Sequence, residues 1–190
     1  MSLLSRIAEA YPDHAESGSL EGFETNRSSI KFYKRFELVI ARNPVPGSSQ
    51  ERGYVDDGEE IIFLDGSVNA ILRANQKDGL QLSQESVPAY LRFFFAHVGG
   101  AQLRVVESSD DATWAEEVME DDTARETVEL ARSMIRPIQV SALPGRKYSA
   151  VLTGVFRNIL VESTLEVQLQ GEIIQKSQRL LLENLPVKFG

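Results

Sequence analysis

The clearest pattern along the chain is an alternation of apolar and polar residues in its last third. Between residues 159 and 169 every second residue is apolar or small, and the residues between them are mostly polar. A period of two is typical of a strand with one buried face. Similar runs, separated by short turn sequences, predict strands at 138–142, 148–156, 159–169 and 172–183. They should form an antiparallel meander whose apolar face is covered by helices.

Apolar residues spaced three and four apart predict the helices. The helical segments expected from this spacing are 1–11, 67–78, 83–98 and 124–135. For the helix at 67–78, Asp65 or Ser67 is suited to cap the N-terminus, and Gly79 is suited to end the helix. Elsewhere Pro12 ends the first helix, since proline cannot continue a helix from within.

The segment 113–135 contains two capping-box patterns, Thr113-x-x-Glu116 and Thr123-x-x-Glu126. In such a box the hydroxyl accepts a free helical N–H and the carboxylate reaches back to the N-cap. The pattern also occurs by chance. Whether 113–135 forms one helix or two is therefore left open.

The remaining sequence predicts isolated strands and loops. Period-two apolar residues in the second half of 30–41 and a β-prone run at 59–64 indicate two strands. The polar stretch 12–29 and the segment from residue 43 to about Gly58 are expected to be loops. We therefore expect an N-terminal helix with a polar, mobile segment at 1–29, followed by a single domain at 30–190.

The predicted fold class is α+β, with helices packed on one face of a curved antiparallel sheet. This order of elements resembles the layout of cystatin-like and NTF2-like domains. The resemblance concerns element order alone, because no motif in the chain identifies a family. A shared layout does not imply a shared function.

Composition excludes several kinds of site. The chain has 190 residues, 42% hydrophobic and 25% charged, as in ordinary globular domains. It contains no cysteine, so thiolate zinc sites, disulfides and cysteine nucleophiles are excluded. The paired aspartates do not match a calcium loop, and no pattern for binding phosphates or dinucleotides is present. We expect neither a metal site nor a cofactor.

The net charge of −8 argues against nucleic-acid binding, which needs a basic surface. Ten carboxylates and one base, Arg125, lie between Glu107 and Glu129. Such a segment can attract a basic protein partner, or it can simply be a solvated helix face. No apolar run is long enough to span a membrane, and the N-terminus does not resemble a secretory signal. A cytoplasmic location is expected.

Candidate chemistry is confined to the helix at 83–98. His97 lies there with Tyr90, Phe94 and Arg92 in an otherwise apolar run. A partly buried imidazole can act as a general base, with Tyr90 orienting a substrate. Arg92 and Phe94 are candidates for ligand binding, and Arg92 can equally pair with a carboxylate or cover apolar surface with its stem. His97 and Tyr90 can equally be core residues with satisfied hydrogen bonds.

The function expected from these patterns is that of a noncatalytic binding or protein-interaction module, because no catalytic motif is present. A homodimer through the apolar side of 159–169 is one way to cover that side. The alternative is a small-ligand carrier or an enzyme, with a pocket near His97 between the helices and the sheet.

Overall fold

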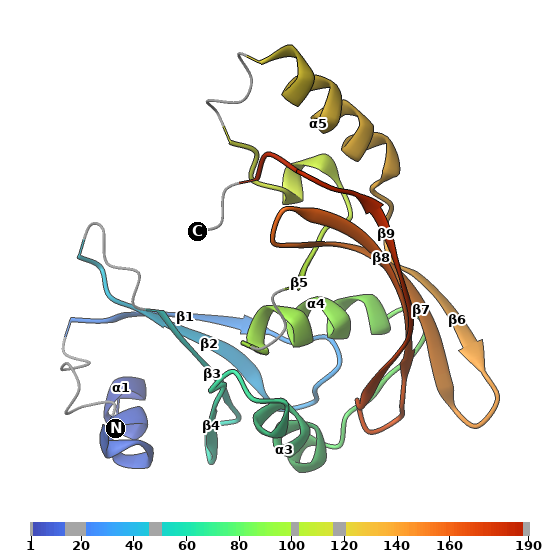
Figure 1. Cartoon of the computed structure of the whole chain (residues 1–190). Helices are drawn as coiled ribbons and strands as arrows, with labels where there is room; N and C mark the ends of the chain where they lie inside the picture. The colour runs from blue at the N-terminus through green and yellow to red at the C-terminus, as the bar shows by residue number, and fades with distance from the viewer. Residues whose placement is uncertain (1, 14–21, 46–50, 100–102, 116–120, 188–190) are drawn as a thin grey trace. The chain divides into compact units, whose positions relative to one another are not determined.

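The computed structural model describes residues 2–13, 22–45, 51–99, 103–115 and 121–187 (Figure 1). The chain divides into two compact units, residues 1–81 and 82–190, which are described separately. Both combine helices with an antiparallel sheet, so the predicted α+β class is confirmed. The predicted domain start at residue 30 falls inside the first unit.

Unit 1 consists of a four-stranded antiparallel sheet and two helices in its described part. The strands lie in chain order, β1 (Glu24–Ser29), β2 (Glu37–Arg42), β3 (Glu51–Asp56) and β4 (Ile61–Phe63). The helices are α1 (Leu3–Ala10) and α3 (Val68–Asp78). Each strand follows its neighbour without a crossover, so the sheet is a simple meander.

Helix α1 covers one face of this sheet. Ile7 is fully buried and packs in one cluster with Val39 of β2 and Tyr54 of β3. An eight-residue helix is barely stable alone in water, so this packing is what maintains α1. The amphipathic pattern at 1–11 thus predicted a helix that the sheet completes.

Helix α3 begins and ends as its sequence predicts. The Ser67 hydroxyl accepts the N–H of Ala70, and Asp65 in turn accepts the N–H of Ser67. Gly79 ends the helix with a φ of 68°, a left-handed conformation that favours glycine. Beside this end the buried Asp78 carboxylate accepts the N–H groups of Lys34 and Arg35, which ties the β1–β2 connection to α3.

Unit 2 contains the predicted meander. Its sheet has the order β5 (Leu103–Val105), β7 (Lys147–Phe156), β8 (Ile159–Val167) and β9 (Ile173–Leu182), with β6 (Gln139–Leu143) also paired to β7. All the pairings are antiparallel. The four C-terminal strands agree with the predicted ranges to within one or two residues at most ends, because alternation and turn signals there are local and unambiguous.

Two helices pack against this sheet. Helix α4 (Val87–His97) lies in the hollow of the curved sheet, whereas α5 (Asp122–Met134) lies near the end where β7 turns into β8 (Figure 1). The α5 residue Ala131 shares a buried cluster with Val155 and Leu160. A short 3₁₀ helix, η1 (Ser109–Asp111), precedes α5.

Two expected loops are strands instead. Residues 24–29, assigned to the polar segment, form β1, and residues 51–56, assigned to a long loop, form β3. All six β1 residues are exposed, so the strand depends on main-chain pairing to β2 and leaves no hydrophobic alternation in the sequence. The capping box predicted at Thr123 is not formed, because Asp121 is the N-cap of α5. The box at Thr113 extends into 116–120, outside the described residues.

Candidate functional site

The α4 residues singled out by sequence do not converge on one site. Tyr90 is fully buried and donates its hydroxyl proton to the carbonyl of Gly171, at 2.6 Å. Phe94 lies beside it, with 6.2 Å between ring centroids. These two side chains therefore face the sheet together. The Tyr90 hydroxyl is engaged in a hydrogen bond to the β8–β9 turn.

Arg92 points elsewhere on the helix. Its guanidinium is exposed and pairs with Glu107, whose other oxygen accepts the N–H of Ile138 at 3.1 Å. Glu107 thereby connects α4 to the start of β6. Burial alone would raise the pKa of Glu107, but the bonds from Arg92 and Ile138 outweigh burial and lower it. Arg92 is thus engaged with a carboxylate of its own chain.

His97, in the last turn of α4, is half-buried. Its ring packs on Phe93, with 4.8 Å between centroids. The structure thus groups His97 with Phe93, and groups Tyr90 with Phe94 and the sheet.

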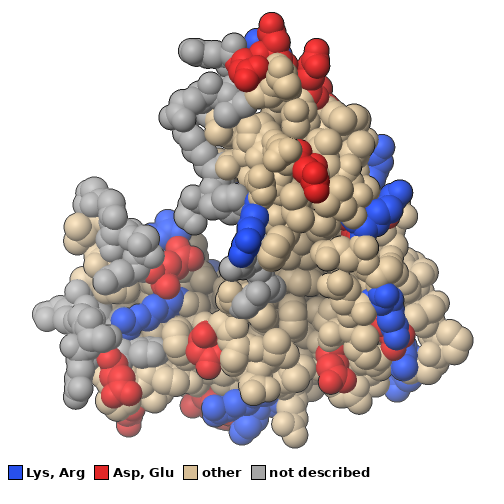
Figure 2. All heavy atoms as spheres, viewed as in Figure 1, with Lys and Arg blue, Asp and Glu red and all other residues tan. Residues whose placement is uncertain are grey.

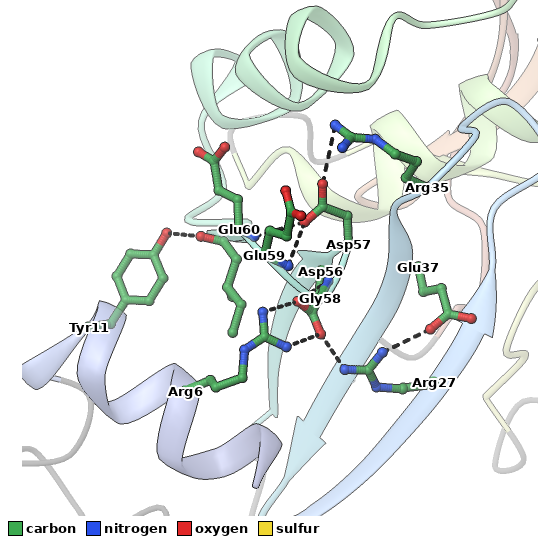
Figure 3. Close-up of polar contacts among 11 residues, drawn as sticks. Arg6, Tyr11, Arg27, Arg35, Glu37, Asp56, Asp57, Gly58, Glu59 and Glu60 are labelled. Atoms are coloured by element: carbon green, nitrogen blue, oxygen red, sulfur yellow. Dashed lines mark hydrogen bonds and ion pairs between the residues drawn. The ribbon is translucent and has the colours of Figure 1, made fainter. Parts of the chain in front are cut away.

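A denser polar cluster lies in unit 1, and the sequence did not point to it. Asp56, whose side chain is fully buried, accepts two hydrogen bonds from Arg6 of α1 and one from Arg27 of β1 (Figure 3). Arg27 also pairs with Glu37 at 2.9 Å, and Asp56 accepts the N–H of Gly58. One carboxylate therefore links α1, β1 and the β3–β4 turn.

The β3–β4 turn carries further carboxylates with fixed partners. Asp57 accepts the N–H groups of Glu59 and Glu60, and Arg35 lies 3.3 Å from it (Figure 3). Burial acts to raise the pKa of Asp57, and these N–H groups outweigh burial and lower it. The Arg73 hydrogen bond lowers the pKa of Glu60. These carboxylates are held ionised and paired. Such groups are suited to holding structural elements together and poorly suited to proton transfer.

The signal for this turn was present in the sequence. Asp57-Gly58 is a typical hairpin turn pair between the runs that became β3 and β4. No sequence signal indicated Arg6 or Arg27 as partners, since they lie 50 and 29 residues from Asp56. Only folding brings them together.

A hollow of about 250 Å³ lies between α1, β4 and the start of α3. It is lined by Tyr11, Ile62, Phe63, Asp65, Ser67, Asn69, Ala70 and Arg73. Most of its polar side chains already have partners. The Tyr11 hydroxyl binds the β4 main chain, Ser67 caps α3, and Arg73 pairs with Glu60. Small size and engaged polar groups do not favour a specific ligand here.

The sheet edges differ in how they are closed. The β9 edge is irregular, with register breaks opposite Leu160/Val161 and Thr164/Leu165, and it carries Lys176 and Arg179. Bulges and charges on an edge strand discourage pairing with other chains. By contrast, β1 is in regular register with β2 over all six residues, and of its two charged residues, Glu24 and Arg27, the arginine is paired with Glu37 and Asp56 of its own sheet. Among the described residues, its outer edge pairs with no strand.

The acidic segment is partly neutralised where the structure describes it. Carboxylates gather over the α5 region in Figure 2, but Asp122 pairs with Arg125 and Glu129 with Arg132 on the helix. Residues 116–120 of the segment lie outside the described part. Across the described ranges, no group of three or more histidine or acidic residues could hold a metal ion, and no helix could cross a membrane.

Comparison with known proteins finds no similarity from which function could be inferred. No family model matches the chain, no curated protein is similar to it, and no solved structure matches its fold.

Proposed function

We propose that the chain is a noncatalytic protein-interaction module that self-associates by adding the β1 strand of a second copy to its own β1 edge. The observation that carries this proposal is that β1 is exposed and regular, and that no described strand pairs with its outer edge. An edge strand presents unpaired N–H and C=O groups, and an extended chain is the partner that satisfies them in register. Two antiparallel β1 strands would make one continuous eight-stranded sheet.

The sequence of β1 suits pairing with itself. Residues directly opposite each other in an antiparallel pair share a face, which limits the registers. A two-fold axis at Asn26 places Thr25 opposite Arg27 and Glu24 opposite Ser28, so no like charges meet. An axis at Arg27 would oppose two arginines. Of these two registers, the one centred on Asn26 is favoured.

Two further observations bear on this proposal, one on the choice of surface and one on catalysis. The apolar side of β8, which suggested dimerisation through the face of the meander, is buried by the chain itself at Val161, Leu165 and Val167. A second copy is not needed to cover that side. The carboxylates of the best-formed polar cluster are also committed to arginines and main-chain N–H groups, which leaves them poorly suited to acid–base chemistry.

The test is the molecular mass in solution, measured by light scattering over a dilution series. We expect a concentration-dependent species at twice 21.2 kDa. Asn26→Lys should weaken it several-fold, because like charges directly opposite cost up to ~1 kcal/mol per pair. Mixing Asn26→Lys with Asn26→Asp should restore it.

Gln76→Lys, on an exposed α3 position, is the matched control and should leave the dimer unchanged. A single mass of 21.2 kDa at every concentration would contradict the proposal. An equal effect of the Asn26 and Gln76 substitutions would place the interface away from β1.

A further inference from the structure

We infer that the hydroxyl of Tyr11 closes the β4 edge of the unit 1 sheet and so restricts strand addition to β1. This inference rests in part on the proposed self-association, but its first test does not require it. The residue is the C-cap of α1 and binds β4, the edge strand opposite β1 in this sheet.

The β3–β4 register identifies the groups that β4 directs outward. Leu64 donates its N–H to Gly53 at 2.9 Å, and Asp57 donates to Glu60 at 3.2 Å. In an antiparallel pair, hydrogen-bonded and non-hydrogen-bonded positions alternate. Ile62 lies midway between these two bonded positions, so its main-chain N–H and C=O point toward β3. Ile61 and Phe63 direct their main-chain groups away from β3, toward the open edge.

Tyr11 occupies two of the four outward groups, one on each of these residues. Its hydroxyl donates to the carbonyl of Ile61 at 3.1 Å and accepts the N–H of Phe63 at 2.8 Å (Figure 3 draws the Ile61 bond). A fifth strand pairing here would use the same carbonyl and the same N–H. A single side-chain hydroxyl thus takes the place of a strand on this three-residue edge.

The ring is held in this position from several sides. Its centroid lies 5.9 Å from Phe63 and 6.1 Å from Tyr54. The preceding helix is anchored by the buried Ile7 and by the paired hydrogen bonds of Arg6 to Asp56. The Tyr11 hydroxyl therefore needs no further ordering to block the edge.

The simpler alternative is that Tyr11 is a packed tyrosine whose hydroxyl has found a partner, as partly buried tyrosines usually do. That need would be met by one bond. The hydroxyl instead fills one acceptor and one donor of the free edge, the Ile61 carbonyl and the Phe63 N–H, which a pairing strand would need.

A consequence follows for assembly. Two copies joined through β1 would present β4 at both outer edges of the combined sheet. With Tyr11 in place at each, growth stops at two. An unblocked β4 would allow further strands to add, and open-ended association could follow.

The first experiment measures amide hydrogen exchange of Phe63 in Tyr11→Phe, which keeps the ring and removes the hydroxyl. The matched control is Tyr33→Phe, which removes a buried hydroxyl bound to Asn75 at 2.6 Å, away from the edge. We expect Phe63 exchange to rise about tenfold relative to other strand amides in Tyr11→Phe only, as loss of roughly one hydrogen bond's protection predicts. Unchanged relative exchange would overturn the inference.

The second experiment measures mass by light scattering. Tyr11→Phe should form species larger than those of the parent chain, whereas Tyr33→Phe should not. Faster Phe63 exchange without larger species would overturn the limit on strand addition. A monomeric parent would refute the β1 proposal alone, since Tyr11→Phe should then still create new association through β4.

Discussion

Asp56 shows how one residue can organise a unit. Its carboxylate is fully buried and is shared by Arg6 and Arg27, which are 20% and 39% exposed. A buried carboxylate is costly unless it is paired and hydrogen-bonded, and here both conditions are met. The sequence is silent on this role, because an aspartate at the end of a strand usually belongs to a turn.

Replacing Asp56 by Asn should lower the free energy of unfolding by about 2–3 kcal/mol. The loss sits at the lower end for a buried pair, because the two arginines retain some access to water. Chemical denaturation measures it. Glu59→Gln, on an exposed neighbour in the same turn, should change stability by less than ~0.5 kcal/mol. Equal effects of the two substitutions would show that the Asp56 bonds contribute nothing net.

At the scale of elements, hydrogen bonds to Glu107 join α4, the η1 turn and β6. Its carboxylate accepts hydrogen bonds from Arg92 and from the N–H of Ile138. Its own main-chain N–H donates to the Asp111 carboxylate at 2.9 Å. The pKa of Glu107 is lowered because these bonds outweigh the effect of burial. Because the pKa of Glu107 is lower in the folded chain than its ordinary value of 4.5, the ionised carboxylate stabilises the fold above about pH 4.5. This stabilisation is lost as the pH falls through the pKa of the folded state.

Glu107→Gln should therefore flatten the loss of stability on acidification below about pH 4.5. Near neutral pH the variant should be less stable than the parent, and the two curves should converge in acid. Urea unfolding at a series of pH values measures this, with Asp110→Asn, an exposed neighbour, as the control. Parallel curves for Glu107→Gln and the parent would contradict it.

At the scale of the whole molecule, each unit has its own buried cluster. In unit 1 it is built around Ile7 and Tyr54, and in unit 2 around Val155 and Leu160. Substitution of a residue that is 0% exposed in one cluster should first reduce the hydrogen-exchange protection of amides in its own unit.

Leu160→Ala should destabilise unit 2 by roughly 2–5 kcal/mol, because it removes buried methyl groups and leaves a cavity. Hydrogen exchange should show reduced protection across β7 and β8, with the amides of β2 and β3 unchanged. Ile7→Ala should give the reverse pattern. Equal loss of protection in both units after either substitution would show that the chain unfolds as one cooperative body.

The sequence by itself determined the C-terminal meander, the ends of α3 and the α+β class. Those features follow from local physics: a period of two, a serine at an N-cap, and a glycine that can adopt a left-handed conformation. Each signal is complete within about a dozen residues, so neighbours along the chain are enough to read it.

Only the tertiary structure decided β1, the Asp56 cluster and the position of Tyr11. β1 has no apolar residue to mark it, and its strand form depends on pairing with β2. Arg6 and Tyr11 each reach partners 50 or more residues away. Such contacts depend on how the elements pack, and neither residue carries a local pattern that reveals its partner. The α4 residues chosen from sequence were likewise separated by the helix, which turns Arg92 toward Glu107 and Tyr90 toward the sheet.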